Sequence, residues 1–527
     1  MPGTFDEMLA SGYGFSGAAV TLGAALHDGT LHAAPAVRIP LAMMNRHGLI
    51  AGATGTGKTK TLQLLTEQLS QAGVPVFVAD IKGDLAGLAM PGTANDRITT
   101  RATETGWNWQ AAGVPVEFVS LTGKPGVQLR ATIASFGPLL LAKVLGLNET
   151  QTSVLTLVFK YADDSQLPLL DLSDLRALLQ FLSSDQGKPE LAQYGGMSSA
   201  TVGVLLRKMV ELEALGAEIL FGEPEFDVHD LLATTRDGKG VVTCLELTDV
   251  QEKPRLFSTF MMWLLAELYQ ALPEAGDLDK PKLVFFFDEA HLLFNDASKA
   301  FLEQVEQVVR LVRSKGVGIY FVTQSPKDVP SDILAQLGNR VQHALRAHTP
   351  DDEKALTAAV RTFPKTSFYD LAGTLTSLGI GEAVVTALDP RGVPTPVVAT
   401  RLIPPGSRMG PLTPEELQAD IQASDLLREY GQAVDRESAR EMLQRRVQAS
   451  APPVREVPRT SFPTSAPEPR PAPAPRSGGM STGAKVGGAI VAALGTTVAR
   501  TVGRELVRGV LGMLGAKPRR NTSRTRW

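Results

Sequence analysis

Residues 49 to 59 read Leu-Ile-Ala-Gly-Ala-Thr-Gly-Thr-Gly-Lys-Thr, an apolar run that leads into the pattern Gly-x-x-x-x-Gly-Lys-Thr. This pattern is typical of a strand that ends in a phosphate-binding loop, because glycines let backbone N–H groups turn inward around a polyphosphate. The next residues predict a helix from about Lys58 to Ala72, whose positive end points at the same anion. The chain is therefore constrained to a fold in which a strand, an anion-binding loop and a helix follow one another.

The loop predicts ATP and Mg²⁺ as cofactors. Lys58 can reach the β- and γ-phosphates, and the hydroxyl of Thr59 can ligate Mg²⁺. The alternative, a glycine-rich turn without a ligand, is disfavoured by the strand before the loop and the helix after it. We therefore expect every residue of the loop to bind the nucleotide, namely Gly52, Ala53, Thr54, Gly55, Thr56, Gly57, Lys58, Thr59 and Lys60.

Composition limits the class of protein. A chain of 527 residues exceeds one ordinary core, so we expect two or three structural units. Hydrophobic residues at 43% and charged residues at 20% describe a soluble globular protein. The net charge of −3 excludes a generally basic surface, so nucleic acid would have to bind at a local patch or in a pore.

Two further features of the sequence concern the location of the protein in the cell. No basic segment precedes an apolar one at the N-terminus, and no run of 18 apolar residues follows, so we expect a cytoplasmic protein. The single cysteine, Cys244, lies in an apolar run, where a small buried side chain is expected rather than a reactive thiol.

Apolar runs alternate with helical patterns after residue 47, which predicts an α/β fold with a mostly parallel central sheet flanked by helices. The runs are almost continuous, so both faces of the sheet should be covered. Between the third and fourth runs the strand signal fades, and helical patterns at 139–160, 170–183 and 198–215 predict a helical insertion. The expected strands are 47–51, 74–80, 114–120, 240–247, 282–288, 317–323 and 339–347.

These patterns divide the chain into segments. Residues 1–47 should form short strands joined to a core at 48–410, with the helical insertion at about 121–239. A helical extension at 411–450 leads into a segment at 451–480, where recurring prolines favour a disordered linker.

The last segment, 481–527, predicts an amphipathic, glycine-rich helix followed by a basic tail. Apolar residues from Ile490 to Leu514 recur at every fourth position. Such a helix can dock on this protein or a neighbouring subunit, bind another protein, or lie on an anionic membrane surface. A mostly disordered tail is a further alternative.

A second motif supplies carboxylates. The run Leu283-Val-Phe-Phe-Phe predicts a buried strand that leaves Asp288 and Glu289 at its carboxyl end. There Asp288 can hold Mg²⁺ together with Thr59, while Glu289 orients and polarises the attacking water. An acid pair after a strand is often only a solvated turn, but its presence with a phosphate-binding loop in one chain favours catalysis.

Two further positions follow from the next strand. Gln324 ends the run Ile-Tyr-Phe-Val-Thr-Gln, where it can cap a loop or contact the γ-phosphate or the water. Arg313 ends the helix before that strand, where the helix dipole alone would favour a cation. The sharper hypothesis is that Arg313 reaches the γ-phosphate of a neighbouring subunit. Arg310, Arg340 and Arg346 are the other candidates for this role.

Two other polar groups are weaker candidates. Asp80-Ile-Lys82-Gly83-Asp84 follows the second core strand, where it forms a turn or places Lys82 or Asp84 near the nucleotide or a translocated substrate. His291 follows the acid pair, but no Cys/His cluster accompanies it, so we interpret it as non-metallic.

Four motifs occur along the chain in the following order: the phosphate-binding loop, Phe-Phe-Phe-Asp288-Glu289-Ala-His, Arg313-Ser-Lys-Gly-Val-Gly and Phe-Val-Thr-Gln324. With these motifs the chain resembles the HerA/FtsK superfamily of ring-forming motor ATPases, and over residues 40–410 the YjgR-like branch of HerA-type ATPases. The resemblance implies a RecA-like P-loop core of the additional-strand type, a sensor at Gln324, an arginine that acts in trans, mapped to Arg313, and hexamers that move double-stranded DNA.

Two features depart from the family pattern. Residues 1–47 are too few for the β-barrel that precedes the core in HerA proteins, and the helical insertion and proline-linked tail are absent from the motor pattern. The leading hypothesis is a Mg²⁺-dependent ATPase acting as a DNA-translocating or helicase-like motor. The alternative is an ATP-dependent switch or scaffold that acts on protein or membrane partners without moving DNA; a small-molecule kinase is third, because the acid pair favours water as acceptor.

Overall fold

The structure is a computed structural model that describes residues 4–294, 299–346 and 349–450. It divides the chain into two units, Met1–Arg446 and Val447–Trp527. The predicted linker at 451–480 and the predicted helix and tail at 481–527 lie outside the described residues, so those predictions stay untested.

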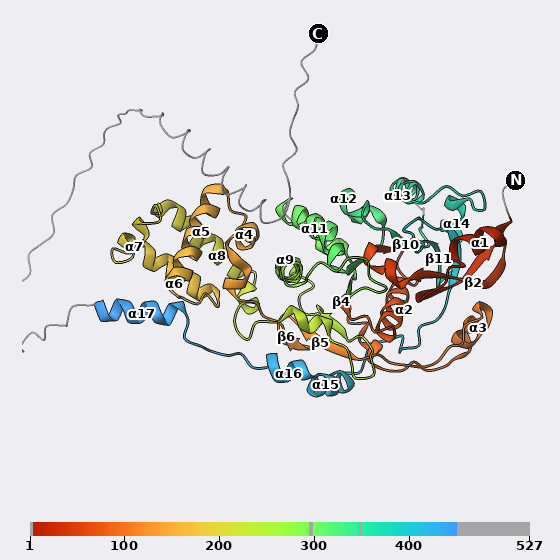
Figure 1. The fold of residues 1–527 in the computed structure, drawn as a ribbon, viewed down its shortest axis with the longest axis horizontal. Coiled ribbons are helices and arrows are strands. Elements are labelled where there is room, and N and C mark those ends of the chain that lie inside the picture. The colour runs from red at the N-terminus through yellow and green to blue at the C-terminus, as the bar shows by residue number, and fades with distance from the viewer. Residues whose placement is uncertain (1–3, 295–298, 347–348, 451–527) are drawn as a thin grey trace, which may run out of the picture. The chain divides into compact units, whose positions relative to one another are not determined.

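One sheet of 12 strands runs through the first unit, in the order β2-β1-β12-β11-β10-β3-β9-β8-β4-β7-β5-β6 (Figure 1). The eight strands from β10 to β6 are parallel, and the remaining four, at the other side, are antiparallel to their neighbours. The predicted α/β class with a mostly parallel sheet is therefore confirmed. The strands are β1 (Ala19–His27), β2 (Thr30–Pro40), β3 (Gly48–Ala51), β4 (Val76–Asp80), β5 (Val116–Ser120), β6 (Val127–Gln128), β7 (Val242–Glu246), β8 (Leu283–Phe287), β9 (Val317–Thr323), β10 (Asn339–His343), β11 (Glu382–Thr386) and β12 (Val398–Leu402).

Apolar side chains alternate between the two faces of the sheet and form two separate layers. In β8, Phe285 and Phe287 join one layer, while Val284 and Phe286 join the other. The first layer packs against α9 and α11, and the second against α1 and α2. Because both faces are covered, the central strands read as continuous apolar runs, as predicted.

The helices surround this sheet. Figure 1 shows α4 to α8 gathered at one side of the sheet, and all five helices lie between β6 and β7 in the chain. The longer helices of the described part are α1 (Phe5–Tyr13), α2 (Lys58–Gln71), α3 (Asp96–Thr105), α4 (Ile133–Leu145), α5 (Glu149–Asp164), α6 (Leu172–Ser183), α8 (Ser199–Ala214), α9 (Pro254–Ala271), α11 (Lys299–Val312), α13 (Pro350–Arg361), α15 (Pro414–Ala423) and α17 (Ala439–Ser450). The shorter ones are α7 (Lys188–Ala192), α10 (His291–Phe294), α12 (Ser331–Leu334), α14 (Leu371–Ser377) and α16 (Asp425–Tyr430).

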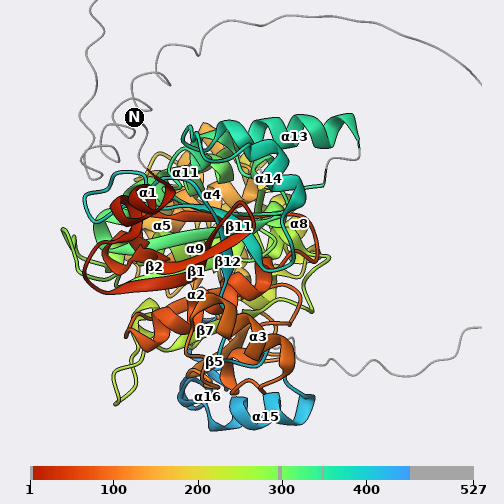
Figure 2. The ribbon, with the colours of Figure 1, turned by 90° about the vertical axis from the view of Figure 1, so that its right-hand side faces the viewer.

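Three parts differ from the sequence-based expectation. The strands within 1–47 are not short: β1 and β2 span 9 and 11 residues, and β1 pairs with β12, so they extend the main sheet (Figure 2). The helix expected at 139–160 is two helices, because Gly146 adopts a left-handed conformation that ends α4 and Asn148 caps α5. Strands β11 and β12 were not expected.

Among the described helices, none combines the length and the apolar character that a membrane span requires.

Candidate active site

The phosphate-binding loop connects β3 to α2 at the carboxyl edge of the sheet. Gly52, Gly55 and Gly57 have φ angles of 154°, 79° and 117°, a region that glycine adopts without strain. A side chain at Gly52 would also place its Cβ 2.5 Å from Cβ of His343. Glycine is therefore required here both by the backbone conformation and by the close approach of β10.

Lys58 folds back into the loop that it follows. Its side chain is only 8% exposed, and Nζ donates to the carbonyl oxygens of Gly52 (2.8 Å) and Ala53 (3.2 Å). Burial lowers the pKa of Lys58, while the nearby charges of Glu289 and Asp288 oppose that shift. The ammonium group thus lies inside the loop and within electrostatic range of the acid pair.

The acid pair follows β8, whose five residues are all buried. Asp288 is 3% exposed, and its Oδ2 has no hydrogen-bond partner among the described residues. Burial and the charge of Glu289 raise the pKa of Asp288 to about 7. Glu289 has a φ of 45°, a conformation that costs a non-glycine residue about 1–3 kcal/mol.

A third charged residue joins the pair from the neighbouring strand β4. Nζ of Lys82 pairs with Oε1 of Glu289, and Nδ1 of His291 lies 3.2 Å from Oε2 without hydrogen-bond geometry. Asp80 holds the intervening turn by accepting backbone N–H groups of Lys82, Gly83 and Leu85. The segment is therefore a turn that places Lys82 against the acid pair, and the position of Lys82 or Asp84 near a nucleotide or a translocated substrate stays a prediction.

Carboxylate oxygens gather where a hard divalent cation would be held. One oxygen from each of Asp80, Asp84 and Asp288 lies within 4.8 Å of the others. Oδ1 of Asp84 and Oδ2 of Asp288 are buried without hydrogen-bond partners. Oxygen donors with unused lone pairs are the ligands that Mg²⁺ prefers, so the residues present fit the predicted metal.

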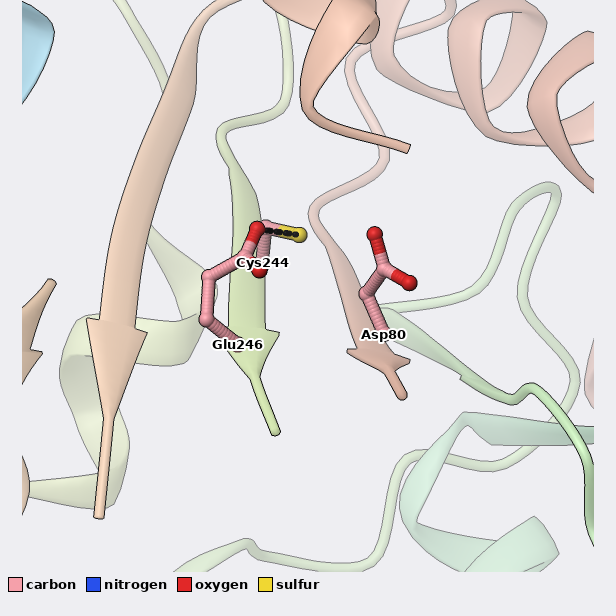
Figure 3. Close-up of side chains that lie close together, drawn as sticks. All are labelled: Asp80, Cys244 and Glu246. Atoms are coloured by element: carbon pink, nitrogen blue, oxygen red, sulfur yellow. Dashed lines mark hydrogen bonds between the residues drawn. The ribbon is translucent and has the colours of Figure 1, made fainter. Parts of the chain in front are cut away.

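A second cluster, formed by Asp80, Cys244 and Glu246, has a different character (Figure 3). Sγ of Cys244 donates to Oε1 of Glu246 at 3.6 Å. Burial raises the pKa of Glu246 to about 8 and holds the pKa of Cys244 well above its usual value, so both groups keep their protons at neutral pH. Cys244 is fully buried in β7, as expected for a small core residue.

Gln324 lies at the carboxyl end of β9, beside the loop. It is exposed and lines a pocket of about 480 Å³ together with Ala53, Thr54, His291 and Arg346. The structure therefore brings Gln324, the loop and a cation from the end of β10 around one opening.

The four candidate arginines occupy different environments. Arg313 is exposed and precedes β9, at the edge of the sheet opposite to the loop. Arg310 pairs with Glu306 one helical turn away. The guanidinium of Arg340 donates to the backbone carbonyls of residues 334, 337 and 362. Within one chain, only Arg346 of these four lines the pocket beside the loop.

Sequence reasoning missed the residues that brace the loop from its other side. The N–H of Gly381 donates to the carbonyl of Thr56 (3.0 Å), and that of Ala53 to the carbonyl of Ala344 (2.8 Å). Nε2 of His343 lies 2.9 Å from Oγ1 of Thr61 in α2. The only local signal was the glycine pair in Gly379-Ile-Gly381, which by itself indicates no more than a turn.

The family model for the helicase HerA-like C-terminal region matches residues 28–520. The DNA double-strand break repair helicase HerA of Saccharolobus solfataricus is 21% identical over 350 residues, 66% of this chain and 63% of the relative. HerA of Pyrococcus furiosus is 24% identical over 425 residues, 72% and 69% of the two chains. The chain thus spans less than two thirds of the first relative's length.

Solved structures with similar folds include the plasmid coupling protein TrwB in complex with an ATP analogue, at 15% identity and a TM-score of 0.48, covering 76% of this chain and 99% of that one. VirB4 of Thermoanaerobacter pseudethanolicus has 14% identity and a TM-score of 0.44, with coverage of 77% and 99%. The family model covers most of the chain, including the loop and the acid pair. The chain therefore belongs to the helicase HerA-like C-terminal family.

Proposed function

We propose that this chain is a Mg²⁺-dependent ATPase that works as a ring-forming motor on double-stranded DNA. One observation carries the ATPase proposal: a buried lysine inside a glycine loop lies within electrostatic range of a buried acid pair, two oxygens of which have no hydrogen-bond partner among the described residues. An unpaired buried carboxylate is costly, so it is expected only where a ligand completes the site.

Each residue of the site has a role in this proposal. Backbone N–H groups of residues 52–60 and the ammonium of Lys58 bind the phosphates, replacing the loop carbonyls that Lys58 now contacts. Thr59 and Asp288 would hold Mg²⁺, with Asp84 as a further oxygen donor in reach of Asp288. When bound, Mg²⁺ neutralises charge on the β- and γ-phosphates.

Glu289 is the proposed general base. It accepts a proton from the attacking water as the bond to the γ-phosphate forms, and ADP leaves with the charge that the loop stabilises. To do so, its carboxylate must give up part of its contact with Lys82. In this proposal Gln324, which is exposed beside the loop, orients the same water or senses the γ-phosphate.

The motor part of the proposal draws on the HerA relatives, which are named as DNA double-strand break repair helicases. A ring of six subunits would let an arginine of one subunit complete the site of the next. Arg313 suits that role because it is exposed and lies away from its own loop, whereas Arg346 would act within its own subunit.

The proposal is tested by measuring ATP turnover of the purified chain with Mg²⁺, with and without double-stranded DNA, and its mass in solution with and without ATP. We expect DNA to stimulate turnover several-fold, and DNA binding to weaken steeply with added salt because phosphate contacts release counterions. Turnover that ignores DNA would favour the alternative, an ATP-dependent switch or scaffold with protein or membrane partners. Absence of ATP binding would refute the whole proposal.

The trans-acting arginine has its own test. Mixing Arg313→Ala with Glu289→Gln subunits should restore part of the activity that each variant lacks alone, because a mixed ring contains intact sites at some boundaries. A mixture of Arg346→Ala and Glu289→Gln subunits should show no rescue, because Arg346 lines the pocket beside the loop of its own subunit. The reverse pattern would assign the trans-acting role to Arg346.

A further inference from the structure

We propose that the turn at residues 378–381 is the binding site for the purine base of the nucleotide, with Ile380 as the apolar surface on which the base lies. This inference rests on the proposed function and deepens it, because it assigns a site for the part of ATP that the phosphate-binding loop does not contact.

The position of the turn follows from the sheet order. The acid pair ends β8, two strands from the loop strand β3 on one side, while the turn precedes β11, two strands from β3 on the other side. Since β11 is antiparallel to β10, it begins at the edge where the parallel strands end. A triphosphate with its γ-phosphate at the acid pair therefore directs its base away from β8, toward this turn.

The turn is joined rigidly to the loop. The N–H of Gly381 donates to the carbonyl of Thr56, and the carbonyl of Gly381 accepts from the N–H of Leu402. From α3, the guanidinium of Arg101 donates to the carbonyls of Gly381 (3.0 Å) and Ile380 (3.1 Å). These bonds hold the backbone of the turn at a constant distance from the phosphate-binding loop.

The side chain that this turn presents is apolar. Ile380 is 75% exposed, the highest value among the large hydrophobic side chains of the described residues. A single exposed apolar residue needs no explanation by itself. Ile380 differs from the others because its backbone is hydrogen-bonded to Arg101 on a turn whose next residue contacts the phosphate-binding loop. Stacking of a planar base on this side chain is favourable, because apolar surface of both the base and the isoleucine is then removed from water.

The test compares two ligands that differ only in the base and sugar. Calorimetry would measure the affinity of the full chain for ATP and for inorganic tripolyphosphate, each with Mg²⁺. We expect Ile380→Ala to weaken ATP binding roughly five- to tenfold, the effect of losing part of a buried isoleucine, with tripolyphosphate binding unchanged. Ile380→Phe, which keeps an apolar surface, should retain ATP affinity within about twofold.

Val393→Ala is the matched control. Val393 is 51% exposed and lies in the turn after β11, at the other end of that strand. It should change neither affinity. Equal ATP affinity of Ile380→Ala and the parent would overturn the proposal, as would an equal loss for both ligands. A change confined to the mass of the assembly would instead assign Ile380 to a subunit contact. If the parent chain binds neither ligand, the proposed function itself fails.

Discussion

The two sides of the phosphate-binding loop differ in the kind of groups that they bring to it. On one side, the acid flank (Lys82, Asp288 and Glu289) holds two buried carboxyl groups, each with one oxygen that has no hydrogen-bond partner among the described residues, and Glu289 has a strained backbone conformation. On the other, the turn flank (His343 and residues 378–381) is joined to the loop by backbone and side-chain hydrogen bonds.

This difference separates two tasks. A partly unsatisfied set of charges is expensive in the ligand-free protein and becomes favourable only when phosphate and metal arrive, so the acid flank is suited to chemistry. A turn whose backbone is hydrogen-bonded to the loop changes little when a ligand binds, so the turn flank is suited to positioning. Substitutions on the two flanks should therefore change different kinetic constants.

The largest effect is expected for Glu289→Gln on the acid flank. Loss of the general base should lower kcat about 10²–10⁴-fold, while ATP affinity changes little because the amide keeps the shape of the carboxylate. Steady-state turnover and equilibrium ATP binding measure the two quantities. Glu415→Gln, an exposed glutamate in α15, is the control and should retain full activity. Unchanged kcat in Glu289→Gln would remove the acid flank from catalysis.

A change on the turn flank should act mainly on binding. Gly381→Val places a branched side chain at a φ of 73° and its Cβ 3.1 Å from Nη1 of Arg101, so the turn must move away from Thr56. We expect ATP affinity to fall about tenfold, roughly 1.4 kcal/mol, with kcat at saturation nearly unchanged.

Gly392→Val separates this effect from backbone strain alone. Gly392 has a φ of 78°, and a Cβ there would meet nothing within 4 Å. This control should lose stability in thermal unfolding and keep its ATP affinity. If both valine variants lose affinity equally, the turn flank has no special connection to the loop.

The contact between Lys82 and Glu289 is expected to give a smaller effect. A double-mutant cycle with Lys82→Met and Glu289→Gln, measured by urea unfolding without nucleotide, should give a coupling free energy of about 1 kcal/mol. We expect a small coupling free energy because the side chain of Lys82 is 46% exposed and solvent screens the ion pair. Additive losses would mean that the contact contributes nothing to stability.

The smallest effect concerns pH and the turn flank. Burial lowers the pKa of His343 to about 4, against 6.5 for the ordinary side chain, so the folded state keeps it neutral. Its contribution is complete above pH 6.5 and is lost progressively as the pH falls toward 4, because the unfolded state binds the proton first.

We therefore expect the stability difference between the parent and His343→Gln to change by about 0.8 kcal/mol between pH 8 and pH 6, to the disadvantage of the parent. Urea unfolding at the two pH values measures it. A difference that does not change with pH would mean that His343 titrates alike in both states.

Much of the fold could be predicted because its signals are local. Seven of the parallel strands read as apolar runs, since buried strands need apolar residues on both faces. Strands β11 and β12 of the antiparallel part were not recognised, because their short runs resemble any partly buried segment. The break between α4 and α5 was missed because a single glycine, Gly146, decided it.

For the candidate site, the sequence by itself determined which groups supply the chemistry. The loop from Gly52 to Thr59 and the strand that ends at Asp288 are recognisable because each motif forms within a few consecutive residues. Their spacing along the chain says nothing about the residues that surround them.

Only the tertiary structure decided which further residues meet the loop. Gly381 and Ala344 bond the loop from the start of β11 and the end of β10, whose places beside β3 are set by strand pairing across hundreds of residues. Pairing of this kind depends on how the whole apolar surface is buried, which no local pattern records. The residues that brace and complete the site were therefore visible only once the sheet was assembled.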